Sequence, residues 1–519
     1  MNDSPSLSTI ERNSMQDAIG FDNEAYLREQ SAAILDRVGR FGNKLYLEFG
    51  GKLLFDYHAA RVLPGFDPNV KMRLLAKLKE KAEILLCIHA GAIERKKMRA
   101  DFGITYDADA MKLIDEVREW GVELRGVVIT RFEGQPAAVQ FQNKLERRGI
   151  PVYTHRPTVG YPAEVDRIVT SEGYGANPYI ETQKPLIVVT GPGPGSGKLA
   201  TCLSQVYHDH LHGVHSGYAK FETFPIWNLP LMHPVNVAYE AATADLHDVN
   251  MIDPFHLEAY GQTAINYNRD IEAFPVLHTI LERITGTDPI YRSPTDMGVN
   301  RASAGIINDS VVQAAARAEV IRRYFRYSSE FVMGLADERT VQRVERLMEV
   351  LHIKPEDRDV VGPARRAAEE AQQQDKGNKG VCCGAAIALH GGTIITGKNS
   401  PLMHAASALV INAVKHLAGL PDEIHLLAPS VIESVARMKK EILGQRAVSL
   451  DLQETLFALG ISVNANPMAQ LCVDKLKQLR GCDVHMTHIP TPGDETGLRR
   501  LGVNLTSDPS FATKNLFVS

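Results

Sequence analysis

The chain has 519 residues, of which 44% are hydrophobic and 23% charged, and a formal net charge of −5 at pH 7. This acidic balance argues against a basic nucleic-acid-binding protein, and no apolar run approaches the ~18 residues of a membrane span. A chain beyond roughly 300 residues exceeds one hydrophobic core, so we expect two or three domains. Six cysteines, two of them adjacent, do not make a disulfide framework, which favours a cytoplasmic protein.

The chain begins with a polar lead and continues into short elements. Residues 1–20 lack a basic start and an apolar core, so we expect a disordered lead rather than a secretory signal. Helical spacing follows over residues 26–38. Residues 44–49 and 52–56 then predict a short β-hairpin around a Gly-Gly turn.

Strand-like and helix-like segments alternate from residue 84 onwards. The predicted strands are 84–89, 126–130, 150–154 and 186–190, and the predicted helices between them include 108–120 and 139–148. Because a β-α-β-α-β order is typical of parallel sheets, we predict an α/β fold. It has a doubly wound, mostly parallel sheet with helices on both faces, over residues 21–307.

The residues that follow the predicted strands are rich in charge. In doubly wound sheets, ligands bind beyond the carboxyl ends of the strands, where the chain connection reverses direction. These positions offer a bound anion the side chains of Arg95, Lys96, Lys97, Arg131, Glu133, His155, Arg156 and Lys198. A solvated surface has a similar composition, so a ligand contact and a plain surface position stay open for each residue.

The most informative segment is the glycine-rich loop after the strand 186–190. It reads Gly191-Pro192-Gly193-Pro194-Gly195-Ser196-Gly197-Lys198 and opens a helix-like stretch. Glycines allow a tight turn with exposed N–H groups, the helix N-terminus contributes a partial positive charge, and the lysine contributes a full one. We therefore predict a phosphate-binding loop formed by Gly193, Gly195, Ser196, Gly197 and Lys198.

The loop departs from both common nucleotide motifs. Gly191 is one residue too far from Gly197 for a Walker A loop, and Leu199 stands where the magnesium-binding hydroxyl belongs. The dinucleotide fingerprint fits residues 195–200 in spacing, with Glu222 about twenty residues later as the ribose-binding acid. ATP with magnesium and NAD(P) are therefore both candidate cofactors, and a glycine-rich turn without a ligand is the third interpretation.

Two later loops supply further candidates. The aromatic, proline-punctuated stretch 224–236 is typical of a site wall. Asp253 is a candidate magnesium ligand or the cap of a helix that starts at the following proline. In the polar loop 293–301, Asp296 and Arg301 either orient a substrate or cap the next helix. The candidate catalytic residues are therefore Lys198, Asp253, Asp296 and Arg301.

A helical, charged segment and a polar linker occupy residues 308–379, and a last domain, 380–519, follows. The strings over 45–58, 191–198, 227–236 and 295–301 resemble a bacterial family known as domain of unknown function eighteen-forty-six (DUF1846). The resemblance covers nearly the whole chain from about Phe21. It implies no activity, but it implies a cytoplasmic bacterial protein with a large α/β region, a helical segment and a smaller C-terminal α/β subdomain.

The C-terminal subdomain looks like a cytidine-deaminase-type α/β layer. Its expected strands are 385–389, 393–396 and 424–428, and its expected helices are 403–417 and 429–443. A zinc deaminase needs His-x-Glu on the first helix and Pro-Cys-x-x-Cys on the second. Here Ala406 replaces the glutamate and Ser430 replaces the first cysteine, so we expect no metal there.

Two classes of function follow. The first is an enzyme that binds a nucleotide or another phosphorylated small molecule. Lys198 favours ATP-type phosphoryl-transfer or ligase chemistry, whereas the spacing and Glu222 favour an NAD(P)-binding oxidoreductase. The second class is a non-catalytic binding or scaffold protein with a degenerate nucleotide site. In either class we expect a homo-oligomer that engages neither nucleic acid nor a membrane.

Overall fold

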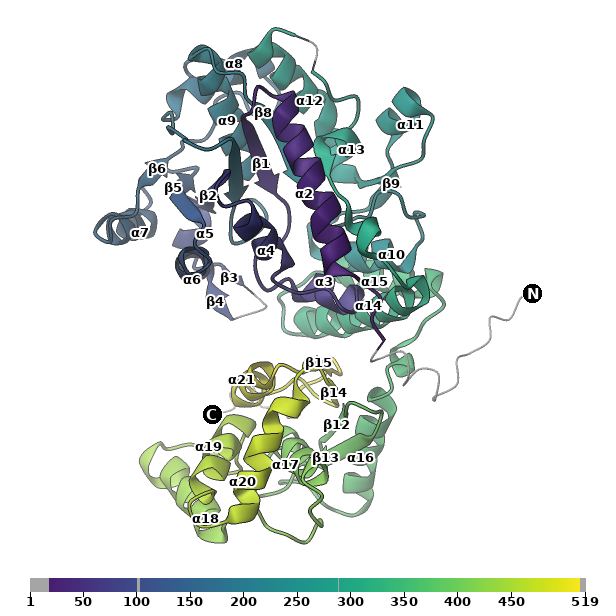
Figure 1. Ribbon diagram of the computed structural model, residues 1–519. Helices are drawn as coiled ribbons and strands as arrows, with labels where there is room; N and C mark the ends of the chain where they lie inside the picture. Colours follow the sequence, from purple (N-terminus) through teal and green to yellow (C-terminus); the bar gives the residue numbers. More distant parts are fainter. Residues whose placement is uncertain (1–17, 100–102, 288, 514–519) are drawn as a thin grey trace, which may run out of the picture. The chain divides into compact units, whose positions relative to one another are not determined.

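The computed structural model describes residues 18–99, 103–287 and 289–513 (Figure 1). The chain forms two compact units. Within the described ranges, the N-terminal unit contains residues 19–240 and 248–316, and the C-terminal unit contains residues 241–247 and 317–513. None of the helices in these described ranges is both long and apolar enough to cross a membrane.

A seven-stranded sheet forms the centre of the N-terminal unit. Its strands are β1 (Leu45–Phe49), β2 (Ala82–His89), β5 (Glu123–Thr130), β6 (Val152–Thr154), β7 (Leu186–Thr190), β8 (Gly217–Phe221) and β11 (Gly298–Val299). Their order is β11-β8-β1-β7-β2-β5-β6, and every pair is parallel. The predicted parallel α/β sheet is confirmed, with β7 at the residues expected for it.

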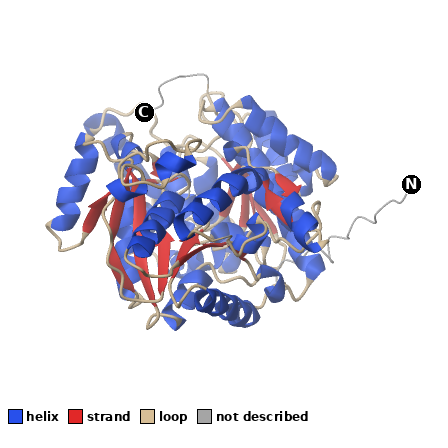
Figure 2. Cartoon of the chain, turned by 90° about the horizontal axis from the view of Figure 1, so that it is seen from above, coloured by secondary structure: helices blue, strands red, loops and turns tan. Residues whose placement is uncertain are grey.

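Helices cover both faces of this sheet, as Figure 2 shows with helices in blue and strands in red. On one face, Leu86 and Ile88 of β2 pack with α5 (Ala90–Glu94), α6 (Tyr106–Glu119) and α7 (Pro136–Glu146). On the other face, Leu85 and Cys87 pack with α9 (Lys198–Leu211) and α12 (Asn268–Thr285). Because β2 is buried on both faces, its sequence is a continuous apolar run rather than an alternating one.

The chain connection reverses direction between β1 and β7. From β1 the chain passes the position of β7 to reach β2, whereas from β7 it passes β1 in the opposite direction to reach β8. In doubly wound sheets this reversal marks the place where ligands bind, at the carboxyl ends of the strands. The glycine loop follows β7 and therefore lies at the switch point.

The predicted hairpin over residues 44–56 is wrong in its second half. Residues 52–56 form no strand, because β1 pairs in parallel with β7 on one side and β8 on the other, which leaves it no free edge. Asp56 instead caps α3 (Tyr57–Val62) and binds Lys71 through a buried ion pair of 2.7 Å.

Smaller elements complete the N-terminal unit. They are α2 (Asn23–Arg40), α4 (Val70–Lys77), β3 (Met98–Arg99), β4 (Ile104–Thr105), α8 (Val165–Ile168), η1 (Tyr174–Ala176), α10 (Pro234–Ala242), β9 (Asn250–Ile252), α11 (Pro254–Tyr260), β10 (Ile265–Tyr267), α13 (Pro294–Met297) and η3 (Ala302–Gly305). The last two residues of α10 belong to the C-terminal unit. The pairs β3–β4 and β9–β10 are antiparallel.

The C-terminal unit contains a four-stranded mixed sheet of order β13-β12-β14-β15. The strands are β12 (Gly384–Ala388), β13 (Ile394–Lys398), β14 (Asp483–Met486) and β15 (Asn504–Ser507). The helices are α14 (Asp309–Val332), which starts in the N-terminal unit, α15 (Glu338–Val350), α16 (Val361–Gln373), α17 (Ala405–Leu417), α18 (Pro429–Arg437), α19 (Leu452–Ser462), α20 (Pro467–Lys475) and α21 (Pro492–Leu501). Short helical turns are η2 (Ala244–Leu246), η4 (Pro355–Asp357), η5 (Met438–Ile442) and η6 (Leu476–Leu479).

The strand expected at 424–428 is absent from this sheet. Leu426 and Leu427 are buried in the core, but the amide of Asn466 donates to the carbonyls of His425 and Leu426, so this backbone is bonded by a side chain and not by a strand. β14 lies beside β12 instead, in antiparallel orientation. The resemblance of this subdomain to a cytidine deaminase stays a prediction.

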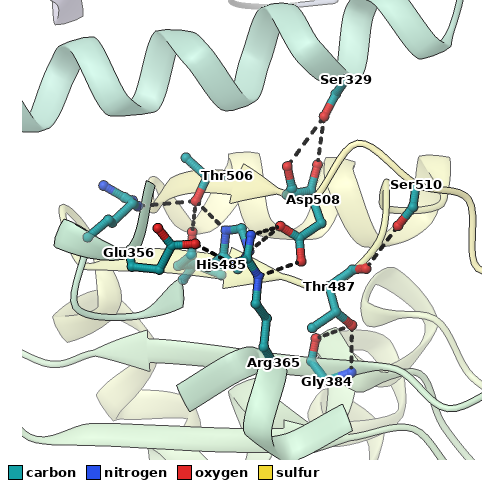
Figure 3. A network of polar contacts seen from close by, with 12 residues as sticks. Ser329, Glu356, Arg365, Gly384, His485, Thr487, Thr506, Asp508 and Ser510 are labelled. Carbon is teal, nitrogen blue, oxygen red and sulfur yellow. Dashed lines mark hydrogen bonds and ion pairs between the residues drawn. The ribbon is translucent and has the colours of Figure 1, made fainter. Parts of the chain in front are cut away.

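Helix α16 packs on this C-terminal sheet. A Cβ added at Gly384 of β12 would overlap the Ala364 carbonyl of α16, so helix and strand are in backbone contact. Figure 3 shows a polar network on the same sheet, in which Arg365 forms two hydrogen bonds with Asp508 (3.1 and 2.7 Å) and Ser329 reaches Ser507. Residues 317–373 therefore belong to the same unit as the C-terminal sheet.

Candidate functional site

The glycine loop joins β7 to α9 through two left-handed residues. Gly195 has φ +73° and Gly197 has φ +85°, a region that residues with a Cβ rarely adopt. Gly197 is the N-cap of α9, and no side chain caps this helix end. The first N–H groups of a helix have no partner within the helix, so the start of α9 leaves donors available at the switch point.

Packing against two neighbouring elements holds the loop in place. The Thr130 hydroxyl, at the end of β5, donates to the Ser196 carbonyl (2.8 Å), and a Cβ at Gly197 would lie 2.7 Å from the same threonine. The Ser196 hydroxyl donates to the Gly193 carbonyl (3.0 Å). A Cβ at Gly193 would overlap the Tyr106 hydroxyl, whereas one at Gly195 would meet nothing within 4 Å. Ser196 is thus part of the loop's own scaffold, and Gly195 borders open space.

Lys198 is the first residue of α9 and is half-buried. It forms no hydrogen bond or ion pair with any residue that the structure describes. Five more cationic side chains follow β2, β5 and β6 and also form no hydrogen bond or ion pair with a described residue. They are Arg95, Lys96, Lys97, Arg131 and Arg156. We call these six residues the cationic rim. All of its members come from the carboxyl ends of four adjacent strands, β7, β2, β5 and β6.

Burial and the positive charge of this rim both lower the pKa of His89, the last residue of β2. Its Nδ1 accepts a hydrogen bond from the Ala92 N–H (3.2 Å), which caps α5. Burial lowers the pKa of His89, and the positive charges of Arg131, Arg95 and Lys97 lower it further. The electrostatic surroundings of His89 therefore favour an anion over a second cation.

At the carboxyl ends of β7 and β6, two buried polar atoms have no hydrogen-bond partner within the described ranges. They are the Thr190 hydroxyl at the end of β7 and Nε2 of His155, which follows β6. The residues are 1% and 3% exposed. Burial lowers the pKa of His155 to about 3, so its ring is neutral at neutral pH. Unpaired buried polar atoms are uncommon in native proteins and call for an explanation at each site.

Glu222 lies just after β8, two strands from β7, and its carboxylate is already engaged. Oε1 pairs with the Lys220 ammonium (2.9 Å), which also contacts Asp270 and Tyr267. Burial raises the pKa of Glu222 to about 7, and Asp270 adds to this effect while Lys220 opposes it. The sequence analysis missed this cluster. Only the i, i+2 spacing of Lys220 and Glu222 on one strand indicates it, because Asp270 is distant in sequence.

The other candidates lie near β11 and α13, at the far side of the sheet from β5. Asp253 is buried, caps α11 by accepting from the His256 N–H, and accepts from the Thr295 hydroxyl (2.7 Å). Asp296 accepts from the hydroxyl of Tyr260. Arg301 is exposed, and its N–H donates to Gln30 (2.8 Å). No hydrogen bond or ion pair in the described part of the chain joins these three side chains to the glycine loop.

A second polar centre lies in the C-terminal unit. Nδ1 of His404 contacts Asp494 (2.7 Å), whose fully buried carboxylate also accepts from the Thr491 hydroxyl and the Leu452 N–H. His404 stands where a zinc deaminase has its first metal ligand, and here the Asp494 carboxylate contacts its ring. In the described ranges, no group of three His, Cys, Asp or Glu side chains is placed to hold a metal ion.

Comparison with known proteins gives a family but no activity. The family model described as domain of unknown function DUF1846, N-terminal, matches residues 19–352, and the corresponding C-terminal model matches residues 356–517. A UPF0371 protein of Clostridium botulinum strain Langeland is 55% identical over 500 residues, covering 96% of this chain and 99% of the relative. A UPF0371 protein of Clostridioides difficile strain 630 is 54% identical over 501 residues, covering 96% and 100%.

Proposed function

The chain belongs to the DUF1846 family, and from the geometry of its glycine loop we propose that it is an enzyme that binds a nucleotide or another phosphorylated small molecule. The observation that carries this proposal is the uncapped start of α9 behind two left-handed glycines, next to Lys198, which has no ion-pair partner in the described ranges. Unpaired N–H groups and an ammonium group at one helix start are suited to a phosphate.

Within this class, phosphoryl-transfer or ligase chemistry with ATP is favoured over nicotinamide chemistry. A dinucleotide site needs an acidic side chain that is free to accept from a ribose hydroxyl. The Glu222 carboxylate is 2.9 Å from the Lys220 ammonium and buried, which weighs against that role. Lys198 supports the ATP alternative, because an ammonium group neutralises developing phosphate charge.

Asp253, Asp296 and Arg301 remain candidates for the residues that act on the other end of the ligand. Their present hydrogen bonds support capping and loop-closing roles, so a catalytic role requires a rearrangement of the loop 293–301 on ligand binding. A cytoplasmic location, a homo-oligomeric state and a deaminase-like C-terminal layer are further parts of this proposal, and they rest on the sequence patterns given above.

The test is ligand binding to the full-length protein and to Lys198→Ala. Isothermal titration calorimetry with phosphate, pyrophosphate, ATP with and without magnesium, NAD and NADP identifies the ligand class. We expect Lys198→Ala to lower the affinity for the bound phosphate compound about tenfold or more, because a charge-assisted hydrogen bond is lost. The matched control is Lys144→Ala, which removes an exposed lysine of α7 with the same charge change.

If Lys198→Ala and Lys144→Ala bind the phosphate compound with equal affinity, the glycine loop is not the binding site. Absence of binding by every compound in the panel would leave the scaffold interpretation ahead, with the loop as a structural turn. Thermal unfolding of both variants checks that neither substitution acts through the fold.

A further inference from the structure

We infer that the ligand carries at least two phosphoryl groups, one at the glycine loop and the next on Arg95 and Arg131 of the cationic rim. This inference rests on the proposed function and specifies the chemical class of its ligand. The class is a diphosphate or triphosphate ester, or inorganic pyrophosphate as its simplest form.

Arg131 lies close to the glycine loop, because the residue before it, Thr130, contacts that loop directly. Thr130 donates to the Ser196 carbonyl and lies against Gly197, so the end of β5 contacts the loop that precedes α9. Arg131 is the next residue, and it is exposed. The Arg131 side chain therefore leaves the backbone one residue after the threonine that contacts the glycine loop, where the first phosphate would bind.

Lys97 and Arg95 follow the end of β2, the strand between β7 and β5. The Lys97 ammonium lies 5.1 Å above the Tyr106 ring, and the hydroxyl of that tyrosine lies against Gly193. Arg95 reaches back towards His89, because a Cβ at Gly91 would contact both the His89 ring and the Arg95 guanidinium. Adjacent strands are about 4.8 Å apart, so cations at the ends of β7, β2 and β5 span roughly 10 Å.

A single phosphate is too small and too weakly charged for this arrangement. A monophosphate carries about two negative charges and extends only a few ångström, so it cannot neutralise Lys198 and the two arginines together. A diphosphate or triphosphate chain matches both the span and the charge. Arginine also presents a planar fork of donors that binds two non-bridging phosphate oxygens at once.

Backbone geometry and unpaired atoms at the same edge support a ligand there. Lys96 and Arg131 have φ of +48° and +50°, a left-handed conformation that costs a residue with a side chain about 1–2 kcal/mol. Such strain is concentrated at binding and active sites. The Thr190 hydroxyl, 1% exposed and without a partner in the described ranges, lies directly before Gly191.

Small molecules are favoured over nucleic acid as the source of these phosphates. The chain as a whole has a net charge of −5, and the six residues of the cationic rim follow the ends of only four adjacent strands beside one glycine loop. Nucleic-acid binding requires instead an extended basic face that follows many phosphates.

The experiment compares inorganic phosphate, pyrophosphate and tripolyphosphate by calorimetry at fixed ionic strength on full-length protein. The test variant is Arg95→Gln with Arg131→Asn, in which asparagine tolerates the left-handed backbone. We expect the affinity for pyrophosphate and tripolyphosphate to fall about tenfold or more and that for phosphate to change less than about twofold. The control is Arg147→Gln with Arg148→Gln, which removes the same charge from exposed positions after α7.

The failures of the two proposals differ. The two-phosphate inference is wrong if the Arg95/Arg131 variant lowers the affinities for phosphate and pyrophosphate equally, or leaves both unchanged. If Lys198→Ala lowers both affinities in that case, the phosphate-binding loop still stands. If Lys198→Ala lowers neither, the proposed function itself fails. If the Arg147/Arg148 control loses pyrophosphate affinity as much as the test variant, long-range charge and not the rim explains the effect, and the inference is overturned.

Discussion

Glycines of the same loop serve different physical purposes at the residue scale. Gly195 and Gly197 both have left-handed backbone angles, but only Gly197 is also enclosed by a neighbour, the buried Thr130. Gly193 is required by the Tyr106 hydroxyl and not by its backbone angle. In the sequence these three glycines form one motif. In the structure, Gly193 and Gly197 are packed against neighbouring side chains, whereas Gly195 borders open space.

This difference gives a testable prediction for two alanine substitutions. Gly195→Ala should lower the free energy of unfolding by about 1 kcal/mol, the cost of the left-handed angle. Gly197→Ala should cost about 3 kcal/mol, because its Cβ must also displace Thr130, whose hydroxyl holds Ser196. Urea unfolding followed by circular dichroism measures both, and equal losses would contradict the role of Thr130.

Asp253 and Glu222 show where prediction of single residues from the sequence stops. The magnesium interpretation of Asp253 rests on the apolar pair before it and the capping interpretation on the proline after it, and the structure shows the cap. Asp270 contacts the Lys220 ammonium that pairs with Glu222, but in the chain it comes only after α10, β9, α11 and β10. A lone sequence contains no signal for that pairing, so the buried cluster around Lys220 could not be predicted.

At the scale of elements, one arginine joins α16 to the C-terminal sheet. Arg358, just before α16, is 4% exposed and pairs with Asp483 of β14 (3.1 Å). It also donates to the Thr506 hydroxyl (3.1 Å) and the Asn504 carbonyl (2.6 Å) of β15. This arrangement fixes the helical segment on the strands that follow it by more than a hundred residues.

We predict that Arg358→Met raises amide hydrogen exchange in both β14–β15 and α16, while β7 keeps its wild-type protection. The expected loss of stability is about 2–4 kcal/mol, because a buried carbonyl and a carboxylate lose their partner. The exposed Arg366→Met, on α16 itself, is the matched control and should leave exchange unchanged. Increased exchange confined to α16 would contradict a shared unit.

Predicted elements agree with the structure where one local pattern is sufficient. The strands at 84–89 and 186–190 are apolar on both faces, and the helices at 26–38 and 108–120 have a clear period, so these appear near the expected bounds. The strands at 52–56 and 424–428 do not form. Their patterns are strand-like, but the sheet has no free edge for the first, and a side-chain amide bonds the backbone of the second.

For the whole molecule, one ion pair in each unit predicts acid sensitivity. Although burial opposes it, pairing with Lys71 lowers the pKa of Asp56 to about 2, and His485 and Arg365 lower that of Asp508 to about 2. A carboxyl group with a lowered folded-state pKa stabilises the protein above its unfolded pKa, and this contribution is lost as pH falls through the folded value.

Stability should therefore fall between about pH 4 and pH 2, with about 2 kcal/mol of the loss due to Asp56. Urea unfolding at a series of pH values measures this loss. Asp56→Asn should flatten the profile in that window, and Asp115→Asn, at an exposed position of α6, should not. A flat wild-type profile would show that the two ion pairs do not contribute.

The sequence by itself determined the parallel α/β sheet, the strand–loop–helix at residues 186–211 and the family, because each depends on local periodicity, glycine spacing or long matching strings. Only the tertiary structure decided which charges meet. The strand order places the ends of β7, β2 and β5 side by side, which gathers the cationic rim around the glycine loop. Coulomb interactions depend on distance in space, and distances in space follow from strand order rather than from position along the chain.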